Sequence, residues 1–357
     1  MNYGVDIKEY AGKKIGVYGG KFLPFHNGHL NCIMKAQSLV DVLFVVVGYD
    51  DEYDKALCAN SKLQWISSRE RERMISRELR DLPNIRVFSQ YEPRTDDYMI
   101  DERVGVSTQS IIATCGGKVD VVFSSEVEYE SYFAQYFPKS KHVVLDADRT
   151  EVNISATKLR TEGVYKHWNL LPKSVKEFYT KRVAICGIES VGKTHLLKML
   201  SSYFNTNHLE EYGRVYYDEL DSYTDVALAS DYEDIAVGHV HQMNIASRES
   251  NKVLLVDTDL IYTQYFHFRQ YGKDHDVLDA MIKGNVEKID AYIYIKPHNF
   301  HELDGTRRPV EEETRQRYNS LLEEMYSNYG RQLCIVDEPE RLKRFEECVK
   351  IIENVLK

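Results

Sequence analysis

Cysteine is scarce in the sequence, and the few cysteines are not paired. Of 357 residues only six are cysteine, and no two are close enough for a CxxC pair. This spacing supports neither a zinc ribbon nor a disulfide framework, and it fits a reduced compartment. The sequence also lacks an apolar stretch long enough to span a bilayer, and no signal peptide is visible. We therefore expect a cytoplasmic protein without a membrane span.

Positive charge is in the minority. Lysine and arginine together number 46 against 56 aspartates and glutamates, which gives a net charge of −10. Such a balance argues against a nucleic-acid partner held by bulk electrostatics. The length suggests two domains of roughly 150 residues each. No glycine–serine linker separates them, so we expect coupled domains rather than freely swinging ones, and a homo-oligomer is left open.

A glycine loop in the middle of the chain, GIESVGKT, lies between a predicted strand at 182–186 and a predicted helix at 195–203. A P-loop needs this order, because the loop amides and the helix N-terminus face phosphate oxygens. We expect Lys193 to reach the β- and γ-phosphates of ATP, and Thr194 to hold Mg²⁺ through its hydroxyl. The alternative is a chance match in a glycine-bearing turn. The expected nucleotide-binding residues are Gly187, Glu189, Ser190, Gly192, Lys193 and Thr194.

Three further groups in the second half are candidates for phosphoryl transfer. A predicted strand at 253–256 ends in Asp257, and a carboxylate there is typical of a Walker B aspartate that reaches Mg²⁺, although it could simply cap a helix. Glu211 and Arg214 could orient the acceptor, with Glu211 also accepting its proton. Arg307 sits beside a glycine in a polar loop and could close over phosphates, although an ordinary solvated loop explains it equally well.

A second glycine-bearing segment, GGKFLPFHNGH, follows a predicted strand at 14–18 and precedes a predicted helix at 30–40. His26 and His29 are three residues apart at the helix start, so they share a face. Two imidazoles there suit attack at the α-phosphorus of a triphosphate, which needs charge stabilisation more than covalent chemistry. A structural histidine and a zinc pair are the alternatives, but no third zinc ligand has convincing spacing. The expected nucleotide-binding residues of this segment are Gly19, Gly20, Lys21 and Phe22.

The rest of the first half alternates between predicted strands and helices, which indicates an α/β fold. A predicted helix at 62–79 is rich in arginine and should present mostly a solvated face. A predicted strand at 119–123 ends in Ser124 and Ser125, where open α/β sheets bind ligands. The segment ISATKLR then offers Ser155 as a helix N-cap together with Thr157 and Arg160. By itself this segment is explained by a capped helix with a basic turn.

The order of these motifs resembles the bifunctional NadR family. HxGH and ISxTxxR come first, and the P-loop GxESxGKT and EYxR follow, so the resemblance covers nearly the whole chain. It implies two doubly wound parallel-sheet α/β domains, a Rossmann-like nucleotidyltransferase followed by a P-loop kinase. We expect the nucleotidyltransferase domain at 1–171, a linker helix at 172–181 and the kinase domain at 182–357.

The resemblance also implies the two activities. The first domain would be a nicotinamide mononucleotide adenylyltransferase that joins the mononucleotide and ATP into NAD and pyrophosphate. The second would be a ribosylnicotinamide kinase that makes the mononucleotide from nicotinamide riboside and ATP. In this family the ISxTxxR segment binds the triphosphate, so Arg160 would grip phosphates in a bidentate manner. The expected small molecules are ATP, Mg²⁺, the riboside and the mononucleotide, with NAD as product.

The sequence departs from the pattern of this family at two points, and two other functions have to be weighed against the one that the family implies. Only about a dozen residues precede the first predicted strand, too few for a helix-turn-helix module, so gene repression is not expected. His195 follows Thr194 where a second hydroxyl residue is common. One rival is a riboflavin kinase–FAD synthetase pair, whose kinase lacks this P-loop form. The other is an NAD-sensing regulator with degenerate sites, which the intact motif residues argue against.

Trp65 is a weak candidate to stack on a pyridinium ring, and a core role explains it equally well.

Overall fold

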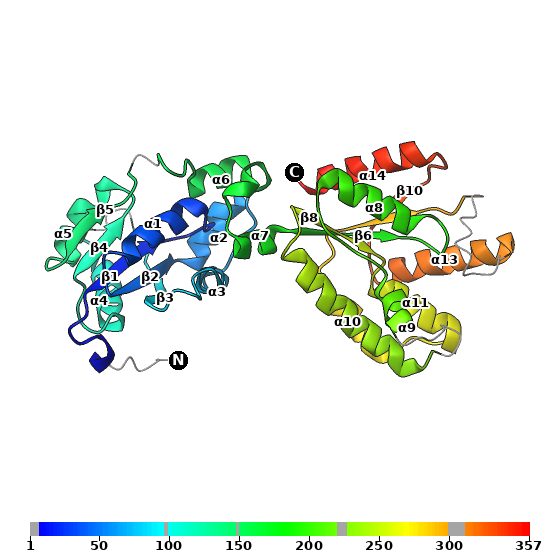
Figure 1. Ribbon diagram of the computed structural model, residues 1–357, viewed down its shortest axis with the longest axis horizontal. Coiled ribbons are helices and arrows are strands. Elements are labelled where there is room, and N and C mark those ends of the chain that lie inside the picture. Colours follow the sequence, from blue (N-terminus) through cyan, green and yellow to red (C-terminus); the bar gives the residue numbers. More distant parts are fainter. Residues whose placement is uncertain (1–6, 96–98, 148–149, 220–226, 299–310) are drawn as a thin grey trace. The chain divides into compact units, whose positions relative to one another are not determined.

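The structure is a computed structural model that describes residues 7–95, 99–147, 150–219, 227–298 and 311–357. The chain divides into two compact units, Met1–Phe178 and Tyr179–Lys357. Each unit contains one five-stranded sheet, and its paired strands are parallel (Figure 1). This arrangement confirms the predicted α/β fold with two parallel-sheet domains. Parallel strands need helical crossovers, which explains the alternation of strands and helices along the chain.

The first sheet has the order β3-β2-β1-β4-β5, so the order changes direction beside β1. The crevice between β1 and β4 is therefore the switch point at which ligands bind in such sheets. Strand β2 is buried along almost its whole length, as expected for a continuous apolar run covered on both faces. The strands are β1 (Ile15–Gly20), β2 (Val42–Tyr49), β3 (Ile85–Tyr91), β4 (Val121–Ser124) and β5 (Lys141–Val144). Gly19 and Gly20 thus end β1 rather than belonging to the loop that follows it.

Polar caps set where the helices of the first unit begin. The arginine-rich helix α3 starts at Ser68, not at 62 as predicted, because Ser67 and Glu70 form a capping box. Trp65 therefore lies in the loop before this helix. Three short 3₁₀ turns, η1 (Ile7–Tyr10), η2 (Val127–Tyr129) and η3 (Tyr165–Leu170), join the larger elements. The helices are α1 (Asn27–Gln37), α2 (Asp51–Ala59), α3 (Ser68–Glu78), α4 (Glu102–Thr114), α5 (Glu130–Tyr136), α6 (Ala156–Glu162) and α7 (Lys173–Tyr179).

The second sheet has the order β10-β9-β6-β8-β7, which places β6 at its centre. The P-loop leaves the carboxyl end of this central strand, between the neighbouring strands β9 and β8. The register pairs Ile185 of β6 with Asp257 of β8, so the expected Walker B residue lies beside the start of the loop. The strands are β6 (Lys181–Cys186), β7 (His208–Leu209), β8 (Val253–Asp257), β9 (Ala291–Ile295) and β10 (Leu333–Val336).

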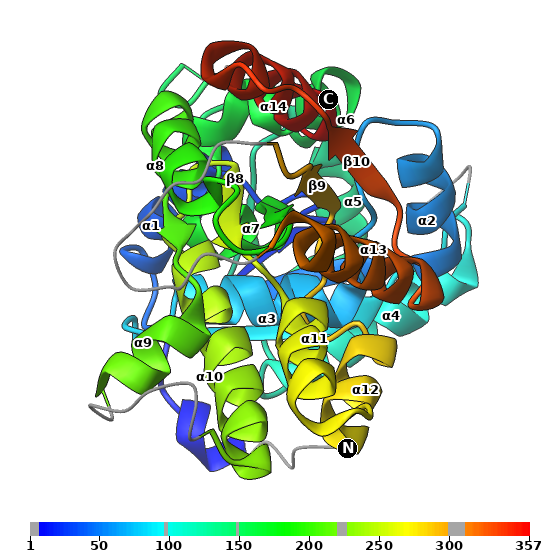
Figure 2. The same ribbon diagram turned by 90° about the vertical axis from the view of Figure 1, so that its right-hand side faces the viewer.

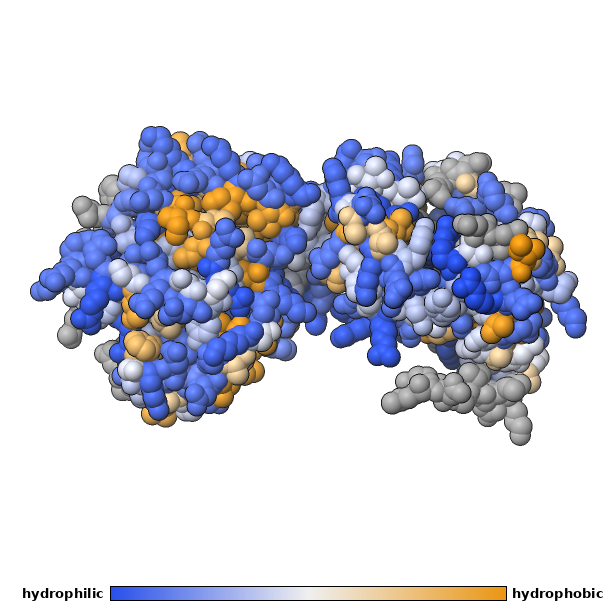
Figure 3. Space-filling view, turned by 180° about the vertical axis from the view of Figure 1, so that it is seen from behind, coloured by the Kyte–Doolittle hydropathy of each residue, from blue (hydrophilic) through white to orange (hydrophobic). Residues whose placement is uncertain are grey.

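Helices cover both faces of this second sheet. Figures 1 and 2 show α8 and α14 on one face and α10 and α11 on the other. Apolar side chains also gather on one part of the surface (Figure 3). Separately, the side chain of Ile335 on the edge strand β10 is exposed. The helices are α8 (Lys193–Phe204), α9 (Tyr212–Glu219), α10 (Ala229–Ser247), α11 (Leu260–Tyr271), α12 (Asp276–Lys283), α13 (Glu312–Asn328) and α14 (Arg341–Val355). Within the described residues, no helix has the length and apolarity that a membrane crossing requires.

The first residue of the P-loop shows why glycine is needed there. Gly187 has φ +136°, and a Cβ atom on it would lie 2.6 Å from the carbonyl oxygen of Ile295. We expect Gly187→Ala to lower the free energy of unfolding of the second unit by more than about 2 kcal/mol, because backbone strain and the clash add.

Gly272 provides the matched control for this substitution. It also has positive φ, +71°, but a Cβ atom there would meet nothing within 4 Å. Gly272→Ala should therefore cost only the backbone strain, about 1–2 kcal/mol. Urea unfolding followed by circular dichroism measures both variants, and equal losses would show that the close contact with Ile295 is unimportant.

Candidate nucleotide sites in the two units

The two histidines of the first unit lie against each other. His26 is buried and caps α1, and its Nδ1 accepts a hydrogen bond from the backbone amide of His29 at 3.3 Å. The two imidazole rings are stacked with centroids 3.6 Å apart. Phe22 and Phe25 pack against His29, with ring centroids 5.0 Å and 5.9 Å away. The motif thus forms a fixed aromatic cluster at the start of α1, and its role in catalysis stays a prediction.

Lys21 is held through both its backbone and its side chain. The guanidinium of Arg71 donates one hydrogen bond to the Lys21 carbonyl oxygen and another to Oδ2 of Asp54, both at 2.6 Å. Oδ1 of Asp54 in turn lies 3.5 Å from the Lys21 ammonium, which is 4.4 Å from the centre of the Tyr53 ring. Arg71 and Asp54 are almost fully buried. A buried ion pair therefore determines where the first expected phosphate-binding lysine lies.

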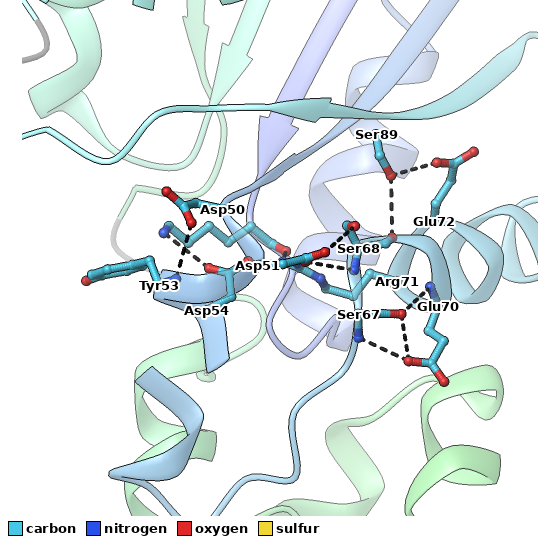
Figure 4. Close-up of polar contacts among 11 residues, drawn as sticks. Asp50, Asp51, Tyr53, Asp54, Ser67, Ser68, Glu70, Arg71, Glu72 and Ser89 are labelled. Carbon is cyan, nitrogen blue, oxygen red and sulfur yellow. Dashed lines mark hydrogen bonds and ion pairs between the residues drawn. The ribbon is translucent and has the colours of Figure 1, made fainter. Parts of the chain in front are cut away.

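Helices α2 and α3 are joined around this ion pair (Figure 4). Asp50 caps α2 by accepting the Tyr53 amide at 3.2 Å, and Asp51 accepts hydrogen bonds from Ser68 at the start of α3. Of the four arginines expected on a solvated face, Arg69, Arg73 and Arg77 are exposed. Arg71 is the exception to this mostly solvated face, because it is buried beside the carboxylate of Asp54, which compensates its charge.

The ISATKLR segment lies beside the histidine motif. Ser155 caps α6, as predicted, and its hydroxyl accepts the Lys158 amide at 3.1 Å. The guanidinium of Arg160 donates to the carbonyl oxygen of Leu23 at 2.8 Å and to Thr157 at 2.9 Å. The structure therefore brings Arg160 to the loop that carries His26. A bidentate grip on phosphate, which would redirect this guanidinium, stays a prediction.

The serines at the end of β4 have structural hydrogen bonds. Ser124 donates to the Glu126 carbonyl at 2.8 Å and lies 2.8 Å from Nε2 of His142, whose Nδ1 pairs with Glu130. This order of groups looks like a hydrolytic triad. However, the Ser124 hydroxyl also donates to the Glu126 carbonyl, a partner that the serine of a hydrolytic triad does not need, so we infer that this arrangement is structural.

Ser125 and the two tryptophans belong to the packing of the first unit in this structure. Ser125 lies 3.2 Å from the hydroxyl of Tyr18, whose pKa is raised by burial. Trp168 is buried, and its ring stacks on that of Tyr165 with centroids 5.8 Å apart. The ring of Trp65 lies under the Lys55 ammonium at 4.6 Å. A nucleotide contact for Ser124 or Ser125 stays a prediction.

Cations contact carbonyl oxygens of the P-loop in the second unit, and of these Lys193 and Arg315 are buried and Arg344 is half-buried. The Lys193 ammonium donates to the carbonyls of Gly187 and Ile188, both at 2.9 Å. Arg315 of α13 donates to the Ser190 carbonyl at 3.4 Å, and Arg344 of α14 donates to the Val191 carbonyl at 3.1 Å. In a trans peptide the amide points opposite to the carbonyl. The two arginines therefore turn the amides of the following residues, Val191 and Gly192, toward the other side of the loop.

Thr194 and Asp257 meet at the start of α8. The Thr194 hydroxyl donates to Oδ2 of Asp257 at 2.6 Å. Asp257 is buried, and within the described residues its Oδ1 has no hydrogen-bond partner. Hydroxyl and carboxylate oxygens are the ligands that Mg²⁺ prefers, and a buried carboxylate oxygen without a partner suits a cation. The pair thus fits the predicted magnesium site.

Asp259 differs from Asp257 although it is only two residues away. Burial, together with the nearby charge of Glu287, raises the pKa of Asp259 to about 8. Its carboxyl group caps α11 by accepting the Tyr262 amide, and it also accepts the hydroxyl of Tyr326 at 2.8 Å. Asp259 therefore serves the structure of this region through these two hydrogen bonds, whereas Asp257 is the carboxylate that meets Thr194.

The remaining predicted residues of this unit are Glu189, Glu211, Arg214 and Arg307. Glu211 and Arg214 pair with each other at 3.7 Å at the start of α9. Glu189 extends from the P-loop to Arg269 of α11 at 2.5 Å. Arg307 lies outside the described residues. Sequence reasoning missed four residues that hold the two loops in place, because no local motif marks them: Asp54, Arg71, Arg315 and Arg344.

The two units define a chain that joins a nucleotidyltransferase-like domain to a P-loop nucleotide-binding domain. A cytidylyltransferase-like family model matches residues 17–162, and an AAA domain model matches residues 182–343. A phosphopantetheine adenylyltransferase from Mycoplasma mycoides is 29% identical over 153 residues, which is 43% of this chain and 99% of that protein.

Relatives that span both units identify the family. The trifunctional NAD biosynthesis/regulator protein NadR of Escherichia coli K12 is 32% identical over 349 residues, which is 96% of this chain and 84% of the relative. NadR of Salmonella typhimurium LT2 matches with the same figures. A crystal structure of NadR in complex with NR has the same fold, with a TM-score of 0.77 at 24% identity over 97% of both chains. The chain belongs to the NadR family.

The buried pair in the first unit gives a test of stability. Arg71→Leu would leave Asp54 as an uncompensated buried charge, so we expect it to lower the free energy of unfolding of this unit by about 3–5 kcal/mol. Arg73→Leu, an exposed position on the same helix, should change it little. Adding Asp54→Asn to Arg71→Leu should recover part of the loss. Urea unfolding measures all three, and equal effects at positions 71 and 73 would contradict the ion-pair account.

Proposed function

We propose that the chain makes NAD in two ATP-dependent steps. The second unit phosphorylates nicotinamide riboside to nicotinamide mononucleotide, and the first unit adenylylates this mononucleotide to NAD with release of pyrophosphate. The family supports this proposal, since the chain covers 84% of a relative named as an NAD biosynthesis/regulator protein. The observation that carries it is the presence of a complete set of motif residues in each unit, both arranged around strand-loop-helix segments.

In the first unit, a phosphate oxygen of the mononucleotide attacks the α-phosphorus of ATP. A new P–O bond forms there, and the bond to the β-phosphate oxygen breaks as pyrophosphate leaves. Because Nδ1 of His26 accepts the His29 amide, the ring hydrogen of a neutral His26 is on Nε2, which makes Nε2 a hydrogen-bond donor. We assign His26 and His29 to stabilising charge on the transferred phosphoryl group, with Lys21 and Arg160 neutralising the phosphates.

In the second unit, a hydroxyl of the riboside attacks the γ-phosphorus of ATP, and ADP leaves. Lys193 would neutralise the β- and γ-phosphates, and its ammonium already lies at the first two carbonyls of the loop. Thr194 and Asp257 would hold Mg²⁺, which when bound offsets charge on the phosphates. Glu211, paired with Arg214, is the candidate to accept the hydroxyl proton.

The adenylyltransferase assignment is tested at His29. His29→Ala should lower kcat for NAD formation from the mononucleotide by at least about a hundredfold, because one donor to the transition state is lost. Phosphorylation of nicotinamide riboside by the same protein should persist, which serves as the internal control. Steady-state assays with each substrate measure the two activities. Normal NAD formation by this variant would refute the role of the HxGH motif.

The kinase assignment is tested at Lys193. Lys193→Ala should abolish formation of the mononucleotide from nicotinamide riboside, because the charge that neutralises the γ-phosphate is lost. NAD formation from added mononucleotide should continue, since we place that chemistry in the other unit. The control is Lys198→Ala on the same helix, where the exposed lysine pairs with Glu210. If Lys193→Ala removes both activities from a folded protein, one shared nucleotide site would have to replace two.

A further inference from the structure

The carboxylate of Glu189 is an unusual feature in a loop that is expected to bind polyphosphate. Glu189 follows Gly187 and Ile188, and the Lys193 ammonium is held at the carbonyls of those two residues. The carboxylate therefore extends from a segment next to the lysine that would meet the β- and γ-phosphates. The negative charges of the Glu189 carboxylate and of the phosphates would repel each other. A carboxylate at this position would weaken ATP binding unless a cation compensates it.

Arg269 is that cation, and it is firmly placed. Its Nη1 lies 2.5 Å from Oε1 of Glu189 and 3.2 Å from the hydroxyl of Tyr265. Its guanidinium also covers the ring of Tyr318 on α13, 3.7 Å from the ring centre. An arginine fixed by an ion pair, a hydroxyl and an aromatic face loses little further freedom when a ligand binds. Arg269 thus fixes the direction in which the Glu189 carboxylate points.

The second oxygen of the carboxylate is available. Arg269 occupies Oε1, and within the described part of the chain no group donates a hydrogen bond to Oε2. The side chains of Glu189 and Arg269 are 20% and 24% exposed, so a ligand can reach them. An ionised carboxylate accepts hydrogen bonds only, and its partner must therefore be a donor such as a hydroxyl.

The acceptor of the phosphoryl group has to approach the same region. In-line transfer places the attacking oxygen on the side of the γ-phosphorus opposite the β-phosphate. The P-loop would enclose the β- and γ-phosphates, and the Glu189 carboxylate projects from this loop to Arg269 of α11. Glu211, by contrast, lies at the start of α9 and pairs with Arg214 of its own helix.

We propose that Glu189 binds the phosphoryl acceptor, and that Oε2 accepts a hydrogen bond from a ribose hydroxyl while Arg269 positions the carboxylate. Glu189 orients the hydroxyl and breaks no bond. The inference rests on the proposed riboside kinase activity, and it narrows the class of acceptor. A neutral or cationic nucleoside fits beside the carboxylate, and nicotinamide riboside carries a cationic ring. The carboxylate favours such an acceptor over a nucleoside monophosphate, because phosphate oxygens only accept hydrogen bonds and cannot donate one to Oε2.

The test begins with the wild-type protein, whose phosphorylation of nicotinamide riboside establishes the activity. Glu189→Gln keeps the size of the side chain and removes its charge, so kcat/KM for the riboside should fall at least about tenfold, the scale for a hydrogen bond to a charged group. KM for ATP should stay within about twofold, and slow ATP hydrolysis without acceptor should persist. The control is Glu210→Gln. Glu210 is exposed and pairs with Lys198, so this substitution should leave kcat/KM for the riboside unchanged.

The outcomes separate the two claims. Absence of riboside phosphorylation in the wild-type protein would overturn the proposed function itself. An active wild type with unchanged riboside kinetics in Glu189→Gln would overturn only the role of Glu189. The role of Glu189 would also be overturned if KM for ATP rose by the same factor by which kcat/KM for the riboside fell, since Glu189 would then bind the nucleotide.

Arg269 is tested as a positioning residue through a double-mutant cycle. Arg269→Lys should lower kcat/KM for the riboside in the wild-type background, because a lysine lacks the planar group that bonds Glu189 and covers Tyr318. In the Glu189→Gln background the same substitution should add little, because the carboxylate that it positions is already neutral. If the two substitutions lowered kcat/KM for the riboside by independent factors that multiply in the double variant, Arg269 would not act through Glu189. The shift in melting temperature caused by ATP verifies that each variant still binds nucleotide.

Discussion

In both units, arginine side chains hold the carbonyl oxygens of the loop that is expected to bind phosphate. Arg71 bonds the carbonyl of Lys21 and Arg160 that of Leu23, while in the second unit Arg315 bonds Ser190 and Arg344 bonds Val191. In a trans peptide, a carbonyl fixed in one direction turns the amide of the next residue in the opposite direction, which applies to Phe22, Val191 and Gly192. The residue after Leu23 is Pro24, which has no amide hydrogen to turn. The same kind of interaction thus fixes the backbone of two unrelated loops, and in the P-loop it turns two consecutive amides to the side away from the arginines.

Two of these arginines, Arg71 and Arg315, are buried, which is costly, and the two units compensate their charge differently. Arg71 lies beside the buried carboxylate of Asp54, so its cost is offset by an ion pair that also reaches Lys21. Arg315 is compensated by carbonyl dipoles, one from Ser190 and one from His298 at 3.2 Å. The first solution makes the loop depend on helices α2 and α3. The second solution makes the P-loop depend on helix α13. The same helix carries Tyr318, whose ring is covered by the guanidinium of Arg269, the partner of Glu189.

The sequence was sufficient to find both loops but not the residues that hold them. A strand, a glycine loop and a helix follow one another within about twenty residues, so periodicity and turn chemistry predict them locally. Arg315 and Ser190 are separated by 125 positions, and Arg344 and Val191 by 153. Such partners are set by how helices pack onto the sheet, which one sequence does not reveal. Trp65 was misplaced for a local reason, because the capping box of Ser67 starts α3 later than periodicity suggested.

The charges beside the two loops differ in a way that follows from the two proposed acceptors. Near the first loop the side chains proposed to meet phosphates are the cations Lys21, whose ammonium lies 3.5 Å from Asp54, and Arg160, which suits an acceptor that attacks with a phosphate oxygen. Near the P-loop the projecting group is the carboxylate of Glu189, already paired with Arg269, which suits an acceptor that attacks with a hydroxyl. Phosphorylation adds two negative charges to the riboside. The mononucleotide thus carries the anionic group that Lys21 and Arg160 are proposed to neutralise in the first unit.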